Sequence, residues 1–223
     1  LDVVDELPGG FIKNLRSVMK EYDSSSILVG EVWEDASNKV SYGERREYLL
    51  GDELDSTMNY PFRLALLDFV LGRRDARAVH KSLMSLYENY PKHHFYSAMN
   101  LIGSHDVPRV LTVMEEEMPR GISNEQREHI KIARLKLVTL WQMTFPGVPS
   151  IYYGDEAGVE GPRDPGNRRT YPWGKENNEI MEWYKTLLAL RNHYDVLRTG
   201  KWQPLYAKHG LYCFLRIIND KTD

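Results

Sequence analysis

Side chains able to take part in catalysis recur just beyond short apolar runs of this sequence. The clearest case is Glu31, which lies inside the run ILVGEVW at 27–33, where a carboxylate is costly unless it is paired or used chemically. Carboxylates are common groups for general acid–base and nucleophilic catalysis. Each one alone is equally well explained as a structural ion pair or a helix N-cap, but three at one face favour a shared site. The other polar or aromatic residues beside such runs are Asp2, Asp5, Trp33, Asn59, Ser104, His105, Asp106, Asp155 and Glu156.

An alternation of strand-like and helix-like segments must position these residues. The order of strand then helix predicts βα units, a parallel sheet and an α/β fold, and in parallel barrels the active site lies at the carboxyl ends of the strands. The polar segment 34–52 indicates a long loop with some helix. A long helix predicted near 125–143 carries Ile130, Ala133, Leu137 and Leu140 on one side. We predict strands at 1–4, 27–33, 53–61, 95–106 (strand, then loop) and 148–154, and helices near 11–22, 64–71, 75–90, 125–143 and 177–194.

The pattern changes after Gly200. KWQPLYA and GLYCFLRII indicate two strands around Lys208-His209-Gly210, with no helix between them. We therefore predict a boundary near 195–200, with an α/β part at 1–197 and the first strands of an antiparallel β domain at 198–223.

Composition excludes several classes of protein. The 223 residues are 42% hydrophobic and 27% charged, which fits a globular chain and excludes collagen-like, disordered and disulfide-scaffold proteins. A net charge of −3 gives no reason to expect nucleic acid or an anionic membrane surface as a partner. The single Cys213 excludes an intramolecular disulfide but does not determine the compartment.

Four segments in order resemble the α-amylase family of glycoside hydrolases. LDVVDEL resembles the segment after barrel strand four, VGEVWED the motif after strand five, and NLIGSHDVPR the motif after strand seven. PGVPSIYYGDEAGVEGPRDPGNRRTYPW at 146–173 is similar to the segment from strand eight into its loop. The resemblance implies a (β/α)8 TIM barrel of which 1–197 is the second half, strands four to eight.

The resemblance also implies roles for individual residues. Asp2 would be the nucleophile, Glu31 the acid/base and Asp106 the carboxylate that stabilises the transition state. His105 would bind substrate, and Asp164 and Arg168 would contact donor-side sugars. Trp33 has two interpretations, stacking on a sugar ring or packing against the barrel. Calcium is common in the family, but no Asp/Asn-rich loop here indicates a site, so we assign no metal ligand and no required cofactor.

The implied activity is that of a retaining α-glucan hydrolase. VGEVWED, MNYPF and IGSHD look most like neopullulanases, cyclomaltodextrinases and maltogenic amylases. Those enzymes attack starch, pullulan or cyclodextrins at α-1,4 bonds, sometimes with α-1,6 cleavage. One alternative is a transglycosylase of the same family, because water and a sugar hydroxyl compete for one glycosyl-enzyme intermediate. Another is a non-catalytic amylase-like interaction subunit, against which the joint presence of Asp2, Glu31 and Asp106 argues.

Features that the family carries before Leu1 are expected to matter. Family members have an Asn-His motif after strand three and an Arg two residues before the nucleophile, and neither is found in these residues. We therefore expect this polypeptide alone to be inactive or nearly so, although its parent is a hydrolase. Open sheet edges favour self-association, or pairing with an N-terminal half of the barrel.

Overall fold

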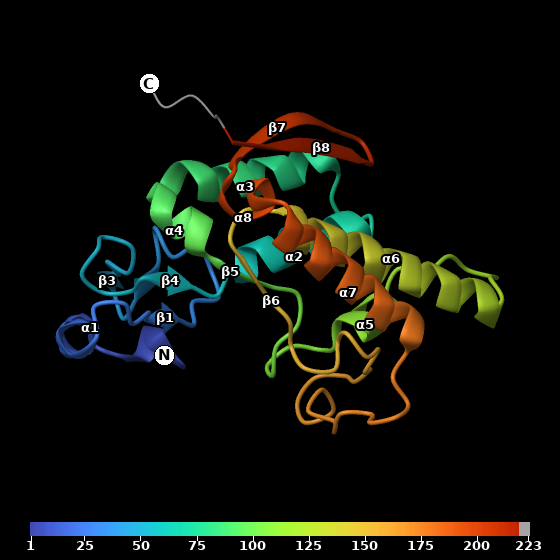
Figure 1. The fold of residues 1–223 in the computed structure, drawn as a ribbon, viewed down its shortest axis with the longest axis horizontal. Helices are drawn as coiled ribbons and strands as arrows, with labels where there is room; N and C mark the ends of the chain where they lie inside the picture. The colour runs from blue at the N-terminus through green and yellow to red at the C-terminus, as the bar shows by residue number, and fades with distance from the viewer. Residues whose placement is uncertain (219–223) are drawn as a thin grey trace.

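A ladder of short parallel strands forms the centre of the molecule. In the computed structural model, which describes residues 1–218, the amino group of Leu1 donates to the Val29 carbonyl (2.6 Å) and the Glu31 N–H donates to the Leu1 carbonyl (3.0 Å). Strand β1 (Val29–Gly30) pairs in parallel with β4 (Ser56–Thr57), and β5 (Met99–Leu101) with β6 (Val148–Ser150). A parallel bridge between Met58 and Met99 joins the two pairs. The segments therefore follow one another in sequence order, as two parallel pairs that this bridge links (Figure 1).

The strands are shorter than the sequence predicts. The chain turns at Asp2 and Val3 and forms a 3-10 helix at Val4–Glu6, so the strand expected at 1–4 is wrong beyond Leu1. The apolar run 27–33 contributes only β1, since the chain turns away from the ladder directly after Glu31. The first residues of the predicted strand at 95–106 belong instead to α4 (Lys92–Ser97). Apolar composition indicates burial here, but buried turns and strands share that composition.

Helices follow the strands, and several begin with a side-chain cap. The Asp75 carboxylate accepts the Ala78 N–H (2.8 Å), and Ser123 and Gln126 form a capping box. The helices predicted near 11–22, 75–90, 125–143 and 177–194 are confirmed within a few residues. Their bounds are α1 Gly9–Tyr22, α2 Tyr60–Val70, α3 Ala76–Asn89, α4 Lys92–Ser97, α5 Val110–Val113, α6 Asn124–Thr144, α7 Asn178–His193 and α8 Asp195–Thr199. The α/β class predicted from the sequence is therefore confirmed.

The polar segment 34–52 contains a small hairpin where the sequence suggested some helix. Strands β2 (Val40–Ser41) and β3 (Glu44–Arg45) pair antiparallel. Tyr42 and Gly43 between them both have positive φ (54° and 79°), the conformation of a tight hairpin turn. The tight turn at Tyr42 and Gly43 therefore favours a hairpin over a helix in this segment.

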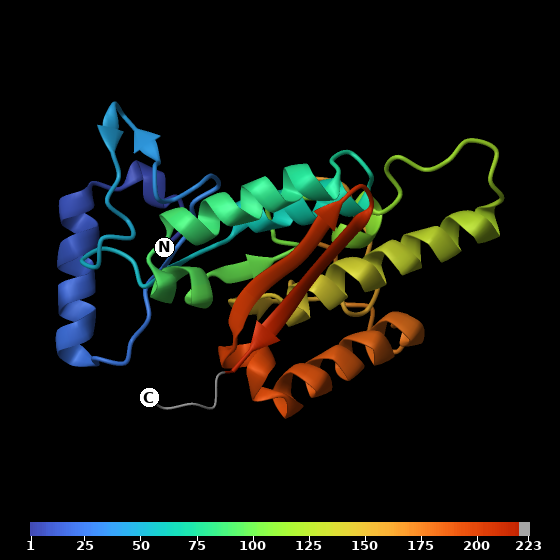
Figure 2. The same cartoon turned by 90° about the horizontal axis from the view of Figure 1, so that it is seen from above.

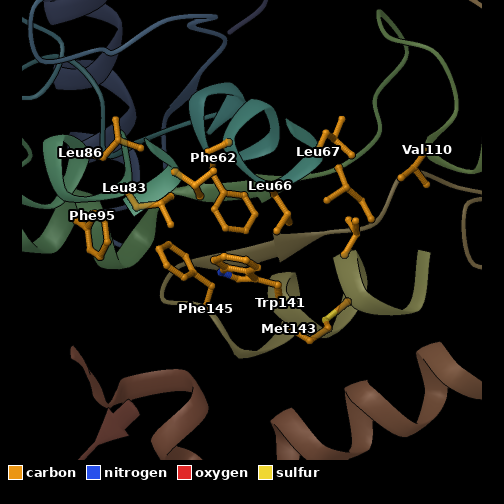
Figure 3. Packing of buried hydrophobic residues seen from close by; sticks show 14 of the residues in the cluster. Phe62, Leu66, Leu67, Leu83, Leu86, Phe95, Val110, Trp141, Met143 and Phe145 are labelled. Carbon is orange, nitrogen blue, oxygen red and sulfur yellow. The ribbon is translucent and has the colours of Figure 1, made fainter. Parts of the chain in front are cut away.

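The main hydrophobic core lies between α2 and α6. Phe62 and Leu66 of α2 point toward Phe145 and Trp141 (Figure 3), and the rings of Phe62 and Phe145 lie 4.9 Å apart. The side of α6 that the sequence analysis singled out lies outward, with Leu137 46% and Leu140 37% exposed. The inner side of α6 instead includes Gln142, which donates to the carbonyls of Asn100 and Ser150. A polar residue thus occupies the inner face because it binds strand carbonyls.

An antiparallel hairpin closes the described part of the chain. Strands β7 (Lys201–Lys208) and β8 (Leu211–Ile217) pair as the sequence predicts. The hairpin lies along α3 and toward α6 (Figure 2), and Trp202 joins the main core. The domain boundary near 195–200 stays a prediction, and residues 219–223 of the predicted β domain lie outside the described residues. Within residues 1–218, no helix combines the length and apolar character needed to cross a membrane.

Arg191 of α7 binds the end of α6, the turn before β6, and α8. Its guanidinium donates to the carbonyls of Met143 (2.7 Å), Gly147 (2.6 Å) and Leu197 (2.9 Å), and the residue is buried. Arg191→Met removes the side-chain donor to the Met143 and Gly147 carbonyls, so we expect a loss of about 2–4 kcal/mol in the free energy of unfolding.

The measurement is urea denaturation of the polypeptide that carries this chain. The control is Arg198→Met, which removes an exposed ion pair with Asp195 and is expected to cost less than about 1 kcal/mol. Equal losses in the two variants would contradict the stabilising role of Arg191.

Candidate active site

Three carboxyl side chains meet at the carboxyl end of the ladder. Asp2 follows Leu1, Glu31 follows β1, and Asp106 lies in the loop after β5. The carboxyls of Asp2 and Asp106 both lie close enough to Glu31 to raise the pKa of its carboxyl. Residues far apart in the sequence therefore form one acidic group, as the sequence analysis expected.

Glu31 is the buried member of this group. Only 5% of it is exposed, its Oε2 accepts the Val3 N–H (3.1 Å), and its buried Oε1 has no hydrogen-bond partner among residues 1–218. Burial is the main cause that raises the pKa of Glu31; the Val3 N–H opposes it, and the carboxyls of Asp2 and Asp106 raise it further. Glu31 is therefore the group best suited to hold and donate a proton.

The backbone at Val3 has an uncommon conformation that serves this contact. Val3 lies in the left-handed region (φ 44°, ψ 43°), which a β-branched residue rarely adopts. The turn directs its N–H at Glu31 while the side chain stays exposed. Strain of this kind persists where surrounding contacts compensate for it, and it is common at functional sites.

Asp106 is surrounded by groups that the sequence analysis predicted. His105 Nε2 lies 3.1 Å from Asp106 Oδ2, and Arg168 Nη2 lies 3.5 Å from Asp106 Oδ1. Arg168 Nε also contacts Asp164 Oδ1 (2.6 Å). The side chains of His105, Arg168 and Asp164 are all partly exposed to solvent.

Trp33 has one ring face against a residue that the sequence analysis missed. The rings of Trp33 and Tyr60 stack at 4.2 Å with an angle of 8° between their planes. Trp33 is 42% exposed, so it packs on one side and is open to solvent on the other. Tyr60 is close because β1 and β4 are neighbours, a pairing that the local sequence does not reveal.

A buried ion pair supports the loops behind the acidic group. Arg109 Nη1 lies 3.2 Å from Asp155 Oδ1, and Arg109 Nε donates to the Asn167 carbonyl (2.7 Å). The Asn167 amide donates to the carbonyls of His105 (2.7 Å) and Val107 (2.8 Å). Arg109 is the last residue of NLIGSHDVPR, and the sequence motif alone indicates no role for it.

Some polar residues that follow strands do not line the site. Asn59 caps α2 by accepting the Phe62 N–H, and its amide donates to the Asn100 side chain. Asp155 is buried in the ion pair with Arg109. Both residues have structural roles, and for the carboxylate Asp155 this is the ion-pair alternative that the sequence left open.

No candidate metal centre is found in the part of the chain that the structure describes. Among residues 1–218, no group of three or more His, Cys, Asp or Glu is placed to hold a metal ion. Carboxyl groups such as those of Glu31 and its acidic neighbours can transfer protons or act as nucleophiles.

The comparisons with known proteins all point to the same family. The model of the α-amylase catalytic domain matches residues 8–174. An amylopullulanase of Thermoanaerobacter thermohydrosulfuricus is 42% identical over 99% of this chain and 15% of its own length. A cyclomaltodextrinase of Thermoanaerobacter pseudethanolicus is 36% identical over 100% of this chain and 35% of its own length. The chain therefore spans about a third or less of these relatives.

Solved structures agree with the sequence relatives. The native debranching enzyme of Nostoc punctiforme superposes with a TM-score of 0.82 at 32% identity, covering 98% of this chain and 44% of that one. The relatives also include a neopullulanase and a maltogenic α-amylase, so the predicted resemblance is confirmed, and the amylopullulanases extend it.

The contacts of Glu31 predict how its proton affinity responds to substitution. Asp106→Asn removes a negative neighbour, which makes the charged form of Glu31 more favourable, so the pKa of Glu31 is expected to fall. The measurement is an NMR titration of ¹³C-labelled glutamate carboxyls in the polypeptide that carries this chain. Asp195→Asn on α8 is the matched control and should leave the Glu31 titration unchanged, whereas an unchanged pKa in Asp106→Asn would contradict the coupling.

Proposed function

Because the chain belongs to the α-amylase catalytic-domain family, we propose that it supplies the catalytic carboxylates of a retaining α-glucan hydrolase. The observation that carries the proposal is the convergence of Asp2 and Asp106 on the buried Glu31, whose pKa is raised. Two carboxyl groups on either side of a glycosidic bond are the machinery of glycoside hydrolysis.

The proposed reaction is a double displacement. Asp2 attacks the anomeric carbon, the glycosidic C–O bond breaks, and Glu31 gives its proton to the leaving oxygen. Water then attacks the same carbon, gives a proton back to Glu31, and releases the sugar from Asp2. Asp106 stabilises the positive charge that develops on the sugar ring, since a carboxylate beside that charge lowers the transition-state energy.

The surrounding polar side chains are proposed to bind the sugar. His105 and Arg168 lie against Asp106, and Arg168 is also paired with Asp164, so hydroxyl groups of a donor sugar would meet charged partners there. The exposed face of Trp33 suits stacking on a sugar ring, while its other face packs on Tyr60.

The proposed substrates are α-1,4-linked glucans, with α-1,6 bonds as further targets. The relatives are named for pullulan, cyclomaltodextrin and branched substrates, and the chain shares 42% identity with an amylopullulanase and 36% with a cyclomaltodextrinase. We extend only the shared class, α-glucans, to this chain. Transglycosylation uses the same intermediate, so product analysis at high substrate concentration is the observation that separates it from hydrolysis.

We also propose that the parallel ladder is strands four to eight of an eight-stranded barrel. Leu1, β1, β4, β5 and β6 follow one another as consecutive parallel strands. Within residues 1–218, β6 pairs on one side only, and Val148 on it is 55% exposed. Further strands, from the same polypeptide or another copy, would cover such an edge.

Substitution of the two proposed catalytic residues tests the function. We expect Glu31→Gln and Asp2→Asn each to lower kcat by about 10³-fold or more, because one removes the proton donor and the other the nucleophile. The assay is hydrolysis of maltooligosaccharides, cyclodextrin and pullulan by the polypeptide that carries this chain, with NMR to record the anomer formed first.

A matched substitution provides the control for this test. Glu182→Gln removes an exposed carboxylate on α7 and should leave kcat unchanged. Retained turnover in Glu31→Gln, or a first product with inverted configuration, would contradict the proposed mechanism.

The behaviour of residues 1–223 expressed alone gives a separate prediction. We expect concentration-dependent self-association, because β6 offers an open edge with an exposed Val148. We also expect little or no turnover from these residues alone. Light scattering over a range of concentrations measures the association. A monomer at high concentration, or turnover that is lost in Glu31→Gln, would oppose this expectation.

A further inference from the structure

Tyr60 and Ser104 connect Trp33 to Asp106. The Trp33 ring stacks on Tyr60 at 4.2 Å, and the Tyr60 hydroxyl lies 3.1 Å from Ser104 Oγ. Ser104 Oγ in turn accepts the Asp106 N–H (3.2 Å). A short series of contacts therefore runs from an exposed aromatic ring to the backbone of a proposed catalytic residue.

The middle of this series is buried and held in place. Tyr60 is 2% exposed and packs with Leu101 and Val107 in a small cluster separate from the main core. It is the first residue of α2, directly after the Asn59 cap. The Tyr60 ring is therefore positioned by a helix start and by β5, and it has little freedom to follow a ligand.

The hydroxyl groups have enough donors and acceptors for these contacts. A serine hydroxyl carries one donor and two lone pairs, so Ser104 can accept from Asp106 and still exchange a hydrogen bond with Tyr60. Burial, together with the charges of Glu31 and Asp106, raises the pKa of Tyr60. Its phenol therefore keeps its proton at neutral pH.

We infer that Tyr60 and Ser104 are a positioning pair that sets Asp106 relative to a sugar lying on Trp33. The inference rests on the proposed function, since it assigns work to Asp106 and Trp33 in that reaction. Neither residue of the pair touches substrate in this role. Their effect is geometric, because small misplacements of a reacting group cost about 10²-fold in rate.

The series of contacts crosses three strand ends that no local sequence feature joins. Trp33 follows β1, Tyr60 follows β4, and Ser104 follows β5. A change at the Tyr60 hydroxyl can reach Asp106 through Ser104, while the ring stack with Trp33 does not need that hydroxyl. Tyr60→Phe therefore separates positioning of Asp106 from support of Trp33.

The test uses Tyr60→Phe, Ser104→Ala and the double variant in the polypeptide that carries this chain. We expect each single variant to lower kcat on maltooligosaccharides by about 10-fold with KM within about two-fold, since loss of geometry affects the transition state more than binding. The double variant should match the single variants rather than multiply them, because both remove one connection. Ser104→Thr keeps the hydroxyl and should restore most of kcat.

Tyr212→Phe is the matched control, since its hydroxyl bonds His80 (3.1 Å) between β8 and α3, and it should leave kcat unchanged. Melting temperatures are recorded for every variant. An unchanged kcat in Tyr60→Phe, a multiplicative loss in the double variant, or no rescue by Ser104→Thr would overturn the positioning role. Full activity of Glu31→Gln would instead overturn the proposed function, and the inference with it.

Discussion

Hydrogen bonds between consecutive parallel strands set the spacing of the proposed catalytic groups. The Glu31 N–H donates to the Leu1 carbonyl, which holds Asp2 beside β1. The Asn59 N–H donates to the Met99 carbonyl, which holds the start of α2 beside β5. Asp2 and Glu31 both leave the chain within a residue of such a bond. A change in strand register would therefore separate the carboxyl groups even if every residue were kept.

The surroundings of Glu31 explain why a carboxyl can be buried at the carboxyl end of these strands. Glu31 loses water on burial, and the Val3 N–H compensates on one oxygen only. The cost is reduced when the group holds a proton, and burial and two neighbouring carboxyls favour that state. The energetic penalty of burying an acid thus produces the property that acid catalysis needs.

The sequence was informative about motifs and helices, and much less so about strands and supporting contacts. Asp2, Glu31 and Asp106 lie in recognisable segments and meet as expected. The helices could be predicted because capping and apolar spacing are local signals. Which side of α6 faces inward could not be predicted from apolar spacing. Leu137 lies on the exposed side, while the inner side carries the polar Gln142, which binds strand carbonyls. The contact of Tyr60 with Trp33 could not be predicted either, because it depends on the pairing of strands that are far apart in the sequence.

The loop that carries Asp106 is held from both sides by polar bonds rather than by packing alone. On one side, Ser104 bonds Tyr60 and accepts the Asp106 N–H. On the other, the Asn167 amide binds the carbonyls of His105 and Val107, and Arg109 binds the Asn167 carbonyl. Hydrogen bonds are directional, whereas apolar contacts tolerate small rotations. A carboxylate that must face a developing charge at a defined place is therefore better oriented by such bonds than by a purely apolar surround.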